Sequence, residues 1–173
     1  MNKTMILAIG GAGCNIAETF VGNASVQWLK DATYVFADSD LSHITQLTDK
    51  GYKTITLHND SDCFKPEIFD GIKKIYILAG LGGMTGSAYI GKAVESTRAV
   101  GIDDITAIVT TPFLFEGEAV IEKAVKTIES ISGIRVKVFN NEALLQKYTD
   151  TDLKSAFGYF EREMLKFMES GEI

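Results

Sequence analysis

The sequence has little proline, little cysteine and no long apolar run. Two prolines among 173 residues argue against a disordered linker. Cys14 and Cys63 are too few and too far apart to predict a disulfide framework or a zinc site. The apolar stretch from Met5 to Ile9 is cut short by glycine, so it fits neither a signal peptide nor a membrane span. We therefore expect a cytoplasmic protein with no membrane partner.

Clusters of Lys and Arg are also missing, and the formal net charge is -6. Binding to a nucleic-acid backbone needs such clusters, so we expect no DNA or RNA partner. A small nucleotide remains compatible with an acidic chain, because backbone N–H groups at helix N-termini can hold phosphates.

Glycine is plentiful, with sixteen residues, and short apolar runs alternate with segments of helical period. This alternation predicts a single α/β domain over residues 1–173, with a doubly wound, mostly parallel six-stranded sheet and helices on both faces. The expected strands are Thr4–Ile9, Thr33–Ala37, Lys53–Leu57, Lys74–Ala79, Ile105–Val109 and Arg135–Phe139. The expected helices are Ile16 to about Leu29, Leu41–Leu47, Gly86 to about Val100, Glu118–Ser130 and Asp152 to about Met168.

Two glycine-rich segments, Gly10–Asn15 and Gly82–Ser87, each follow a strand and precede a helix. In doubly wound sheets, ligands bind outside the carboxyl ends of the strands, where strand order reverses. Small residues there leave backbone amides uncovered, and the hydroxyls of Thr85 and Ser87 add donors. The pair of segments therefore predicts a phosphate site.

Other chemistries fit less well. No Gly-Lys-Ser or Gly-Lys-Thr follows either segment, so the site is not a Walker motif. An NAD-type oxidoreductase is an alternative, because Asp38 ends the second strand where an acid would bind a ribose. However, the third glycine of that fingerprint falls on Ile16.

Asp38 and Asp40 could coordinate Mg²⁺ through water or cap a helix. His43 and His58 lack metal-ligand spacing and are expected on the surface or in loops.

Five blocks together resemble the FtsZ/tubulin superfamily and lie in its order over nearly the whole chain. Gly10–Asn15 resembles the first phosphate loop of FtsZ, and Ala79–Ala88 resembles its signature AGMGGGTGTGA. The remaining blocks are Val109–Gly117, similar to VTKPFxFEG, Asn141–Leu145, similar to PNDxLL, and Ser155–Gly158, similar to DAFG on the central helix. The resemblance implies the GTP-binding domain of that superfamily and GTP or GDP as ligand.

The resemblance also implies a role for individual positions. The two glycine segments would line the phosphates, Glu116 would lie near the ribose, Asn141 would bond the guanine and Phe157 would stack beside it, while Glu161 could accept from the guanine N1 and N2 groups. The full set of expected ligand-binding residues is Gly11, Ala12, Gly13, Cys14, Asn15, Gly82, Gly83, Met84, Thr85, Gly86, Ser87, Glu116, Asn141, Phe157 and Glu161.

The sequence departs from the family pattern at several of these places. Met84 stands where the family has glycine, Val120 replaces an arginine, and Glu161-Arg162 replaces an Asn-Asp pair. Asn59-Asp60-Ser61-Asp62 stands in place of the loop that approaches the γ-phosphate, and its two acids would repel a third phosphate unless a metal ion intervened.

Two expectations follow from the end of the sequence at Ile173. FtsZ continues into a second domain that supplies acids to the nucleotide of the next subunit, so we expect no activation domain here and little or no self-activated hydrolysis. The last helix carries an apolar stripe that either meets a second copy or an FtsZ/tubulin-like partner, or packs on the sheet. Its members are Phe157, Phe160, Met164, Phe167 and Met168, whereas Tyr159 and Leu165 are expected to point elsewhere.

Two functions remain open besides the NAD-type oxidoreductase. The first is a guanine-nucleotide-binding protein whose self- or hetero-association depends on the nucleotide. The second is a degenerate scaffold or regulator that binds nucleotide weakly or not at all, which Met84 and Val120 favour.

Overall fold

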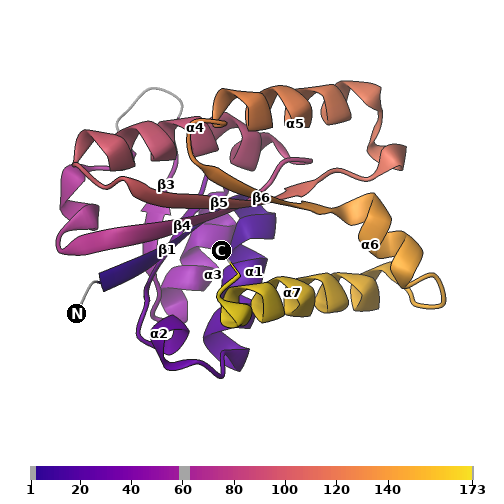
Figure 1. The fold of residues 1–173 in the computed structure, drawn as a ribbon, viewed down its shortest axis with the longest axis horizontal. Coiled ribbons are helices and arrows are strands. Elements are labelled where there is room, and N and C mark those ends of the chain that lie inside the picture. The colour runs from indigo at the N-terminus through magenta and orange to yellow at the C-terminus, as the bar shows by residue number, and fades with distance from the viewer. Residues whose placement is uncertain (1–2, 59–62, 173) are drawn as a thin grey trace.

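The computed structural model describes residues 3–58 and 63–172 and contains one six-stranded sheet in which every pairing is parallel (Figure 1). The strand order is β3-β2-β1-β4-β5-β6, which confirms the predicted doubly wound fold. The strands are β1 (Lys3–Ile9), β2 (Thr33–Asp38), β3 (Lys53–Thr56), β4 (Ile72–Gly80), β5 (Asp104–Thr111) and β6 (Arg135–Asn140).

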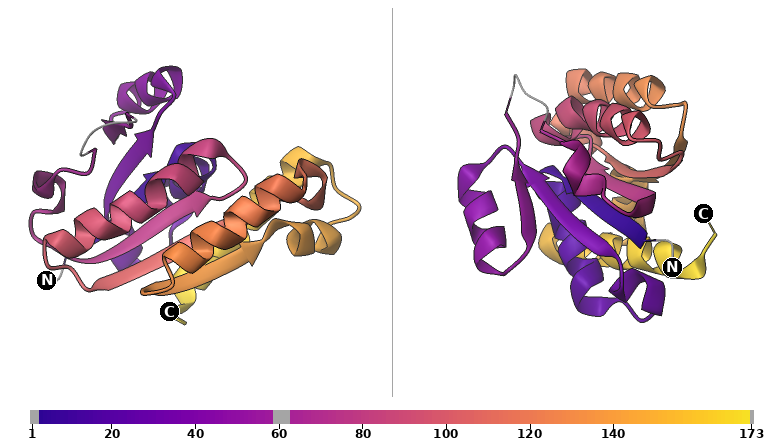
Figure 2. Two further views of the ribbon diagram at one scale, coloured as in Figure 1. Left: turned by 90° about the horizontal axis from the view of Figure 1, so that it is seen from above. Right: turned by 90° about the vertical axis from the view of Figure 1, so that its left-hand side faces the viewer.

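Helices cover both faces of the sheet, and Figure 2 shows α4 and α5 together on one side of it. On the opposite face, α1, α2, α3 and α7 share a second apolar cluster, with α6 packed at its margin. The helices are α1 (Gly10–Asn23), α2 (Gln27–Lys30), α3 (Leu41–Asp49), α4 (Met84–Ala99), α5 (Glu118–Ser130), α6 (Asn141–Lys147) and α7 (Leu153–Ser170), and the short 3₁₀ turns are η1 (Pro66–Phe69) and η2 (Leu114–Glu116). Among the described residues, no helix is long and apolar enough to cross a membrane.

The central strands are apolar on both sides, because each face is covered by helices. In β1, Met5, Leu7 and Ile9 belong to the cluster beneath α4 and α5. Ile6 and Ala8 point the other way, into the cluster beneath α1 and α7. The chain leaves this centre in both directions, so the strand order reverses between β1 and β4. Both glycine segments therefore lie at the carboxyl ends of these two central strands, where the order reverses.

The first helix differs from its prediction. It begins at Gly10 rather than Ile16, so the expected loop Gly10–Asn15 forms the first turns of α1. Gly10 adopts a positive φ of 75°, which lets the chain turn from strand to helix at once. The helix also ends at Asn23, and Trp28 lies half-buried in the separate α2. Local propensity missed this boundary because the helix start depends on packing against β4.

Helix α6 was not predicted, since the Asn140-Asn141 pair looked like the end of a strand. Instead, the Asn140 side chain accepts a hydrogen bond from the Ala143 N–H at 3.1 Å and caps a new helix.

The apolar stripe of α7 packs on the chain's own sheet. Phe160, Met164 and Met168 are buried in the same cluster as α1, and Phe167 is partly buried there. Leu165, expected to point elsewhere, is buried too. Only the N-terminal part of the stripe remains open, where the Phe157 side chain is 40% exposed. Most of this helix therefore needs no partner chain to cover it.

Candidate functional site

Two helix N-termini meet at the carboxyl edge of β1 and β4. Helix α1 begins at Gly10 and α4 at Met84, and neither N-cap residue, Ile9 or Gly83, makes a side-chain capping hydrogen bond. Neither first turn contains an acidic residue. The first-turn N–H groups of both helices therefore lack the usual capping acceptor, and their dipoles favour an anion at this edge.

Several glycines here are required by close packing of backbone. A Cβ on Gly86 would overlap the Gly80 carbonyl oxygen, and a Cβ on Gly13 would overlap the Leu78 carbonyl oxygen. A Cβ on Gly80 would lie 2.6 Å from the Ala12 Cβ. A Cβ on Gly10 would lie 3.3 Å from the Gly86 backbone nitrogen, which shows that the two glycine segments touch each other. These residues hold α1 and α4 tightly against the sheet.

Gly11 and Gly83 differ, because a Cβ on either would meet nothing within 4 Å. Both residues lie at the starts of the two helices and border open space. Packing therefore does not explain these two glycines, whereas close approach of a ligand to the backbone would.

Three side chains of the second glycine segment, Gly82–Ser87, have different surroundings. Met84 is 81% exposed, so its bulk lies in solvent and is not packed into the segment. The Ser87 hydroxyl donates to the Leu81 carbonyl at 3.1 Å, which leaves it partly engaged. The Thr85 hydroxyl lies 2.8 Å from the Ser39 hydroxyl and stays at the edge of the sheet.

Glu116 lies beside the second segment. Its Oε1 accepts a hydrogen bond from the Phe113 N–H at 2.8 Å. A Cβ on Gly82 would lie only 2.7 Å from the Glu116 Oε2, so the carboxylate approaches this glycine closely. Glu116 therefore lies beside the Gly82–Ser87 segment, and its role near a ribose stays a prediction.

Next to this edge is a cavity of about 500 Å³, which is within the usual range for small-molecule sites. It brings together Asn15, Asn141, Phe157 and Glu161, which come from α1, α6 and α7. Its other lining residues are Ala12, Ile16, Thr110, Lys154, Gly158, Phe160 and Met164. Since Ala12 and Asn15 line it, the cavity lies beside the first turns of α1.

Glu161 is held in this cavity by a neighbour on α1. The Thr19 hydroxyl donates to its Oε2 at 2.7 Å. Burial raises the pKa of the Glu161 carboxyl above its ordinary value, and the bond from Thr19 opposes that rise. In the described part of the chain, Oε1 has no hydrogen-bond partner, so one acceptor remains for a ligand.

Cys14 points away from the ligand space. Its thiol is fully buried and lies 3.9 Å from the Ala8 carbonyl oxygen and 3.8 Å from that of Ala37. Burial first, and then the nearby charge of Asp38, raises the pKa of this thiol to about 12. Cys14 therefore contributes backbone to the first segment, while its side chain belongs to the core.

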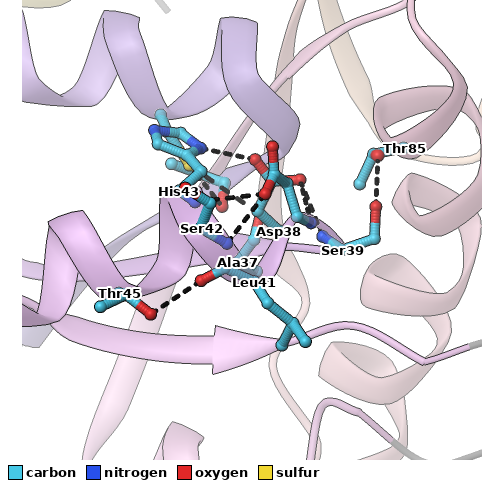
Figure 3. Close-up of polar contacts among 11 residues, drawn as sticks. Ala37, Asp38, Ser39, Leu41, Ser42, His43, Thr45 and Thr85 are labelled. Atoms are coloured by element: carbon cyan, nitrogen blue, oxygen red, sulfur yellow. Dashed lines mark hydrogen bonds and ion pairs between the residues drawn. The ribbon is translucent and has the colours of Figure 1, made fainter.

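The sequence interpretation of His43 was wrong, because this residue is neither in a loop nor on a free surface. Its Nδ1 lies 2.6 Å from the Asp38 Oδ2 in a partly buried pair (Figure 3). His58, in contrast, is exposed after β3, as expected. The spacing of the two histidines could not reveal this contact, because His43 meets Asp38 only where the chain turns from β2 into α3.

Lys154 was also missed, although its spacing could have revealed it. Positions 154, 157, 158 and 161 fall on one face of a helix, and all four line the cavity. The lysine therefore brings a cation to a cavity that also holds the Glu161 carboxylate.

The described residues hold no group of three His, Cys, Asp or Glu side chains arranged for a metal ion. The Asp40 Oδ1 caps α3 by accepting from the Ser42 and His43 N–H groups, so the capping interpretation is confirmed. Asp38 is likewise bonded by groups of its own chain. The Asn59–Asp62 segment, expected near a third phosphate, lies outside the described residues.

Comparison with known proteins points to one group. A scan against family models finds no match. The sequence is 27% identical to the cell division protein FtsZ of Haloferax mediterranei over 172 residues, which is 88% of this chain and 44% of that protein. It is 23% identical to FtsZ of Mycoplasmopsis pulmonis over 171 residues, which is 88% of this chain and 43% of that one. The chain thus spans less than half the length of these relatives.

Solved structures give the same answer for the fold. An empty FtsZ dimer of M. jannaschii superposes with a TM-score of 0.74 at 20% identity, over 95% of this chain and 52% of that one. A GTPγS-bound protofilament of CetZ2 from Haloferax volcanii superposes with a TM-score of 0.75 at 15% identity, over 95% of this chain and 56% of that one. The chain is therefore similar in sequence to FtsZ, and it has the fold of the FtsZ/tubulin-like N-terminal domain.

Proposed function

We propose that the chain binds GDP or GTP, with the phosphates at the two helix N-termini and the base in the adjacent cavity. The observation that carries the proposal is that these two features lie side by side at the start of α1. Two uncapped helix starts border open space at Gly11 and Gly83. The cavity beside them, which Ala12 helps to line, is also lined by two aromatic rings, two amides and a carboxylate.

The base end favours guanine over adenine. Guanine presents two neighbouring donors, N1–H and N2–H, and the Glu161 Oε1 that Thr19 leaves open can accept from this edge of the base. Asn141 and Lys154 supply donors that suit the guanine O6 acceptor, and Phe157 offers a face for stacking. Adenine has no N1–H, so it would leave part of the Glu161 carboxylate unpaired.

We expect hydrolysis by this chain to be slow. The carboxylates nearest the phosphate edge, Asp38 and Glu116, already accept hydrogen bonds from groups of the chain itself. Asp38 uses both of its oxygens in these bonds, and Glu116 keeps only Oε2 to activate a water molecule. Magnesium would be held mainly by the phosphates, since the described side chains offer no cluster for it.

The comparisons support association as a second part of the proposal. The similar structures include an FtsZ dimer and a CetZ2 protofilament with GTPγS. By analogy, this chain would associate with a second copy or with an FtsZ/tubulin-like protein, as a cytoskeletal type of protein does, and the nucleotide would control that association. Sedimentation with GDP, with GTP and without nucleotide tests this part, and an unchanged size in all three would contradict it.

The binding test begins with the purified protein. Denaturation followed by chromatography identifies any nucleotide that was carried along, and the emptied protein is then titrated with GDP, GTP, ADP and NAD⁺. We expect guanine nucleotides to bind at least tenfold more tightly than ADP. Adenine would leave polar groups of the cavity unpaired, and a cost of about 1.4 kcal/mol corresponds to a tenfold weaker affinity. Tighter binding of NAD⁺ would favour the oxidoreductase alternative, and no binding at all would favour the degenerate scaffold.

A further inference from the structure

Asp38 connects the end of β2 to the start of α3 through three hydrogen bonds. This carboxylate is only 4% exposed. Its Oδ1 accepts from the Ser39 N–H at 2.7 Å and from the Asp40 N–H at 3.3 Å (Figure 3). Its Oδ2 accepts from the His43 Nδ1, which carries the hydrogen because a carboxylate oxygen accepts. Both oxygens therefore hold the turn between β2 and α3.

That turn reaches the phosphate edge through Ser39. Figure 3 shows the Ser39 hydroxyl directed at Thr85, and the two oxygens are 2.8 Å apart. Thr85 lies in the first turn of α4, and on its other side a Cβ on Gly10 would approach its Cβ to 3.3 Å. The start of α1 at Gly10, the first turn of α4 and the β2–α3 turn thus meet at Thr85.

The charge of Asp38 makes its position important. It is close enough to α1 to contribute to the raised pKa of the Cys14 thiol. A carboxylate that was free to turn toward the edge would repel a bound phosphate. The two N–H groups and the imidazole all donate to it, which fixes its orientation and offsets part of its charge.

From this geometry we infer that His43 is a positioning residue for the nucleotide site. Through Asp38 it fixes the β2–α3 turn, and the turn in turn places Ser39 against Thr85 beside the phosphates. His43 itself does not touch the ligand. The inference rests on the proposed function and extends it to a side chain that lies outside both glycine segments.

The first test does not depend on any nucleotide. In His43→Ala, amide hydrogen exchange at Ser39 and Asp40 should become faster, because their common acceptor loses its third partner. His43→Asn should restore slow exchange, since its side-chain amide can donate near the position of Nδ1. Thr45→Ala is the matched control on the same helix, because within residues 3–58 and 63–172 that hydroxyl donates to the Leu41 carbonyl at 2.9 Å and to no group of the β2–α3 turn. Unchanged exchange in His43→Ala would overturn the inference.

The second test measures whether His43 acts through Ser39, using GDP as the probe. We expect His43→Ala to weaken GDP binding about fivefold, the effect of one average hydrogen bond, with His43→Asn and Thr45→Ala close to wild type. In a Ser39→Ala background, His43→Ala should cause no further loss. Fully additive losses would show a general effect on folding and would overturn the positioning role.

The two inferences can be told apart. If the wild-type chain binds GDP and His43→Ala binds it equally well, only the positioning role fails. If the wild-type chain binds no guanine nucleotide, the proposed function fails, and with it the role of His43 at that site. The exchange measurement still decides whether His43 fixes the turn in either case.

Discussion

The two ends of the candidate site differ in what forms them. We call the starts of α1 and α4 the phosphate end and the cavity between α1, α6 and α7 the base end. At the phosphate end, backbone packs against backbone, and Gly13, Gly80 and Gly86 leave no room for a Cβ. At the base end, side chains from three helices surround a cavity, and one of its rings, Phe157, is 40% exposed. The first end has one geometry that the fold imposes. The second depends on which side chains the helices carry, so it can change while the fold stays the same.

The substitution with the largest expected effect tests the rigid end. Gly86→Ala would push a methyl group into the Gly80 carbonyl, and we expect it to lower the free energy of unfolding by roughly 3 kcal/mol. Gly91→Ala on the same helix meets nothing within 4 Å and should raise it by about 0.5–1 kcal/mol. Urea unfolding of both variants measures the difference. Equal effects would show that backbone packing does not define this end.

A smaller effect is expected at the base end. Phe157→Ala should weaken GDP binding about tenfold, because one base loses its aromatic partner. Tyr159→Ala is the matched control, since Tyr159 lies on the same helix, is 39% exposed and does not line the cavity. Calorimetric titration of both variants gives the comparison. If Tyr159→Ala lost as much affinity as Phe157→Ala, the base would not be stacking where we place it.

The smallest effect concerns Glu161 and should have opposite signs for binding and stability. Burial raises its folded pKa above the ordinary value of 4.5, so the ionised carboxylate destabilises the empty fold. Glu161→Gln should therefore be slightly more stable than wild type at neutral pH and yet bind GDP more weakly.

The pH dependence of that stability gain follows from the same shift. The gain is fully present above the folded pKa and fades as the pH falls below the ordinary value, because the carboxyl is then protonated in both the folded and the unfolded chain. Thermal unfolding between pH 4 and pH 8, chosen to span about four units around these values, measures it. A variant less stable than wild type at neutral pH would mean that the bond from Thr19 outweighs burial.

The same contrast explains what could be predicted from the sequence. The strands were found because their apolar runs are continuous, and the two glycine segments stood out because only glycine permits such close packing. That these segments hold phosphates stays a prediction. The start of α1 was misplaced, since its helical turns at Gly10 depend on contact with β4. The Asp38–His43 pair was missed because two residues five apart meet only when a strand turns into a helix.

At the base end, the residue types were predicted but their surroundings were not. Asn141, Phe157 and Glu161 do share one cavity, yet nothing in the sequence indicated that Thr19 holds Glu161. Contacts between residues so far apart in the chain follow from how α1 and α7 pack, which local patterns do not encode.

The measurement that tests the central claim most directly is an amide NMR titration of the nucleotide-free protein with guanosine and with GDP. The account predicts that both ligands shift resonances around Asn15 and Phe157, while only GDP also shifts the amides of Gly11 and Gly83. It would be contradicted if GDP left Gly11 and Gly83 unshifted, or if it shifted only residues remote from both helix N-termini.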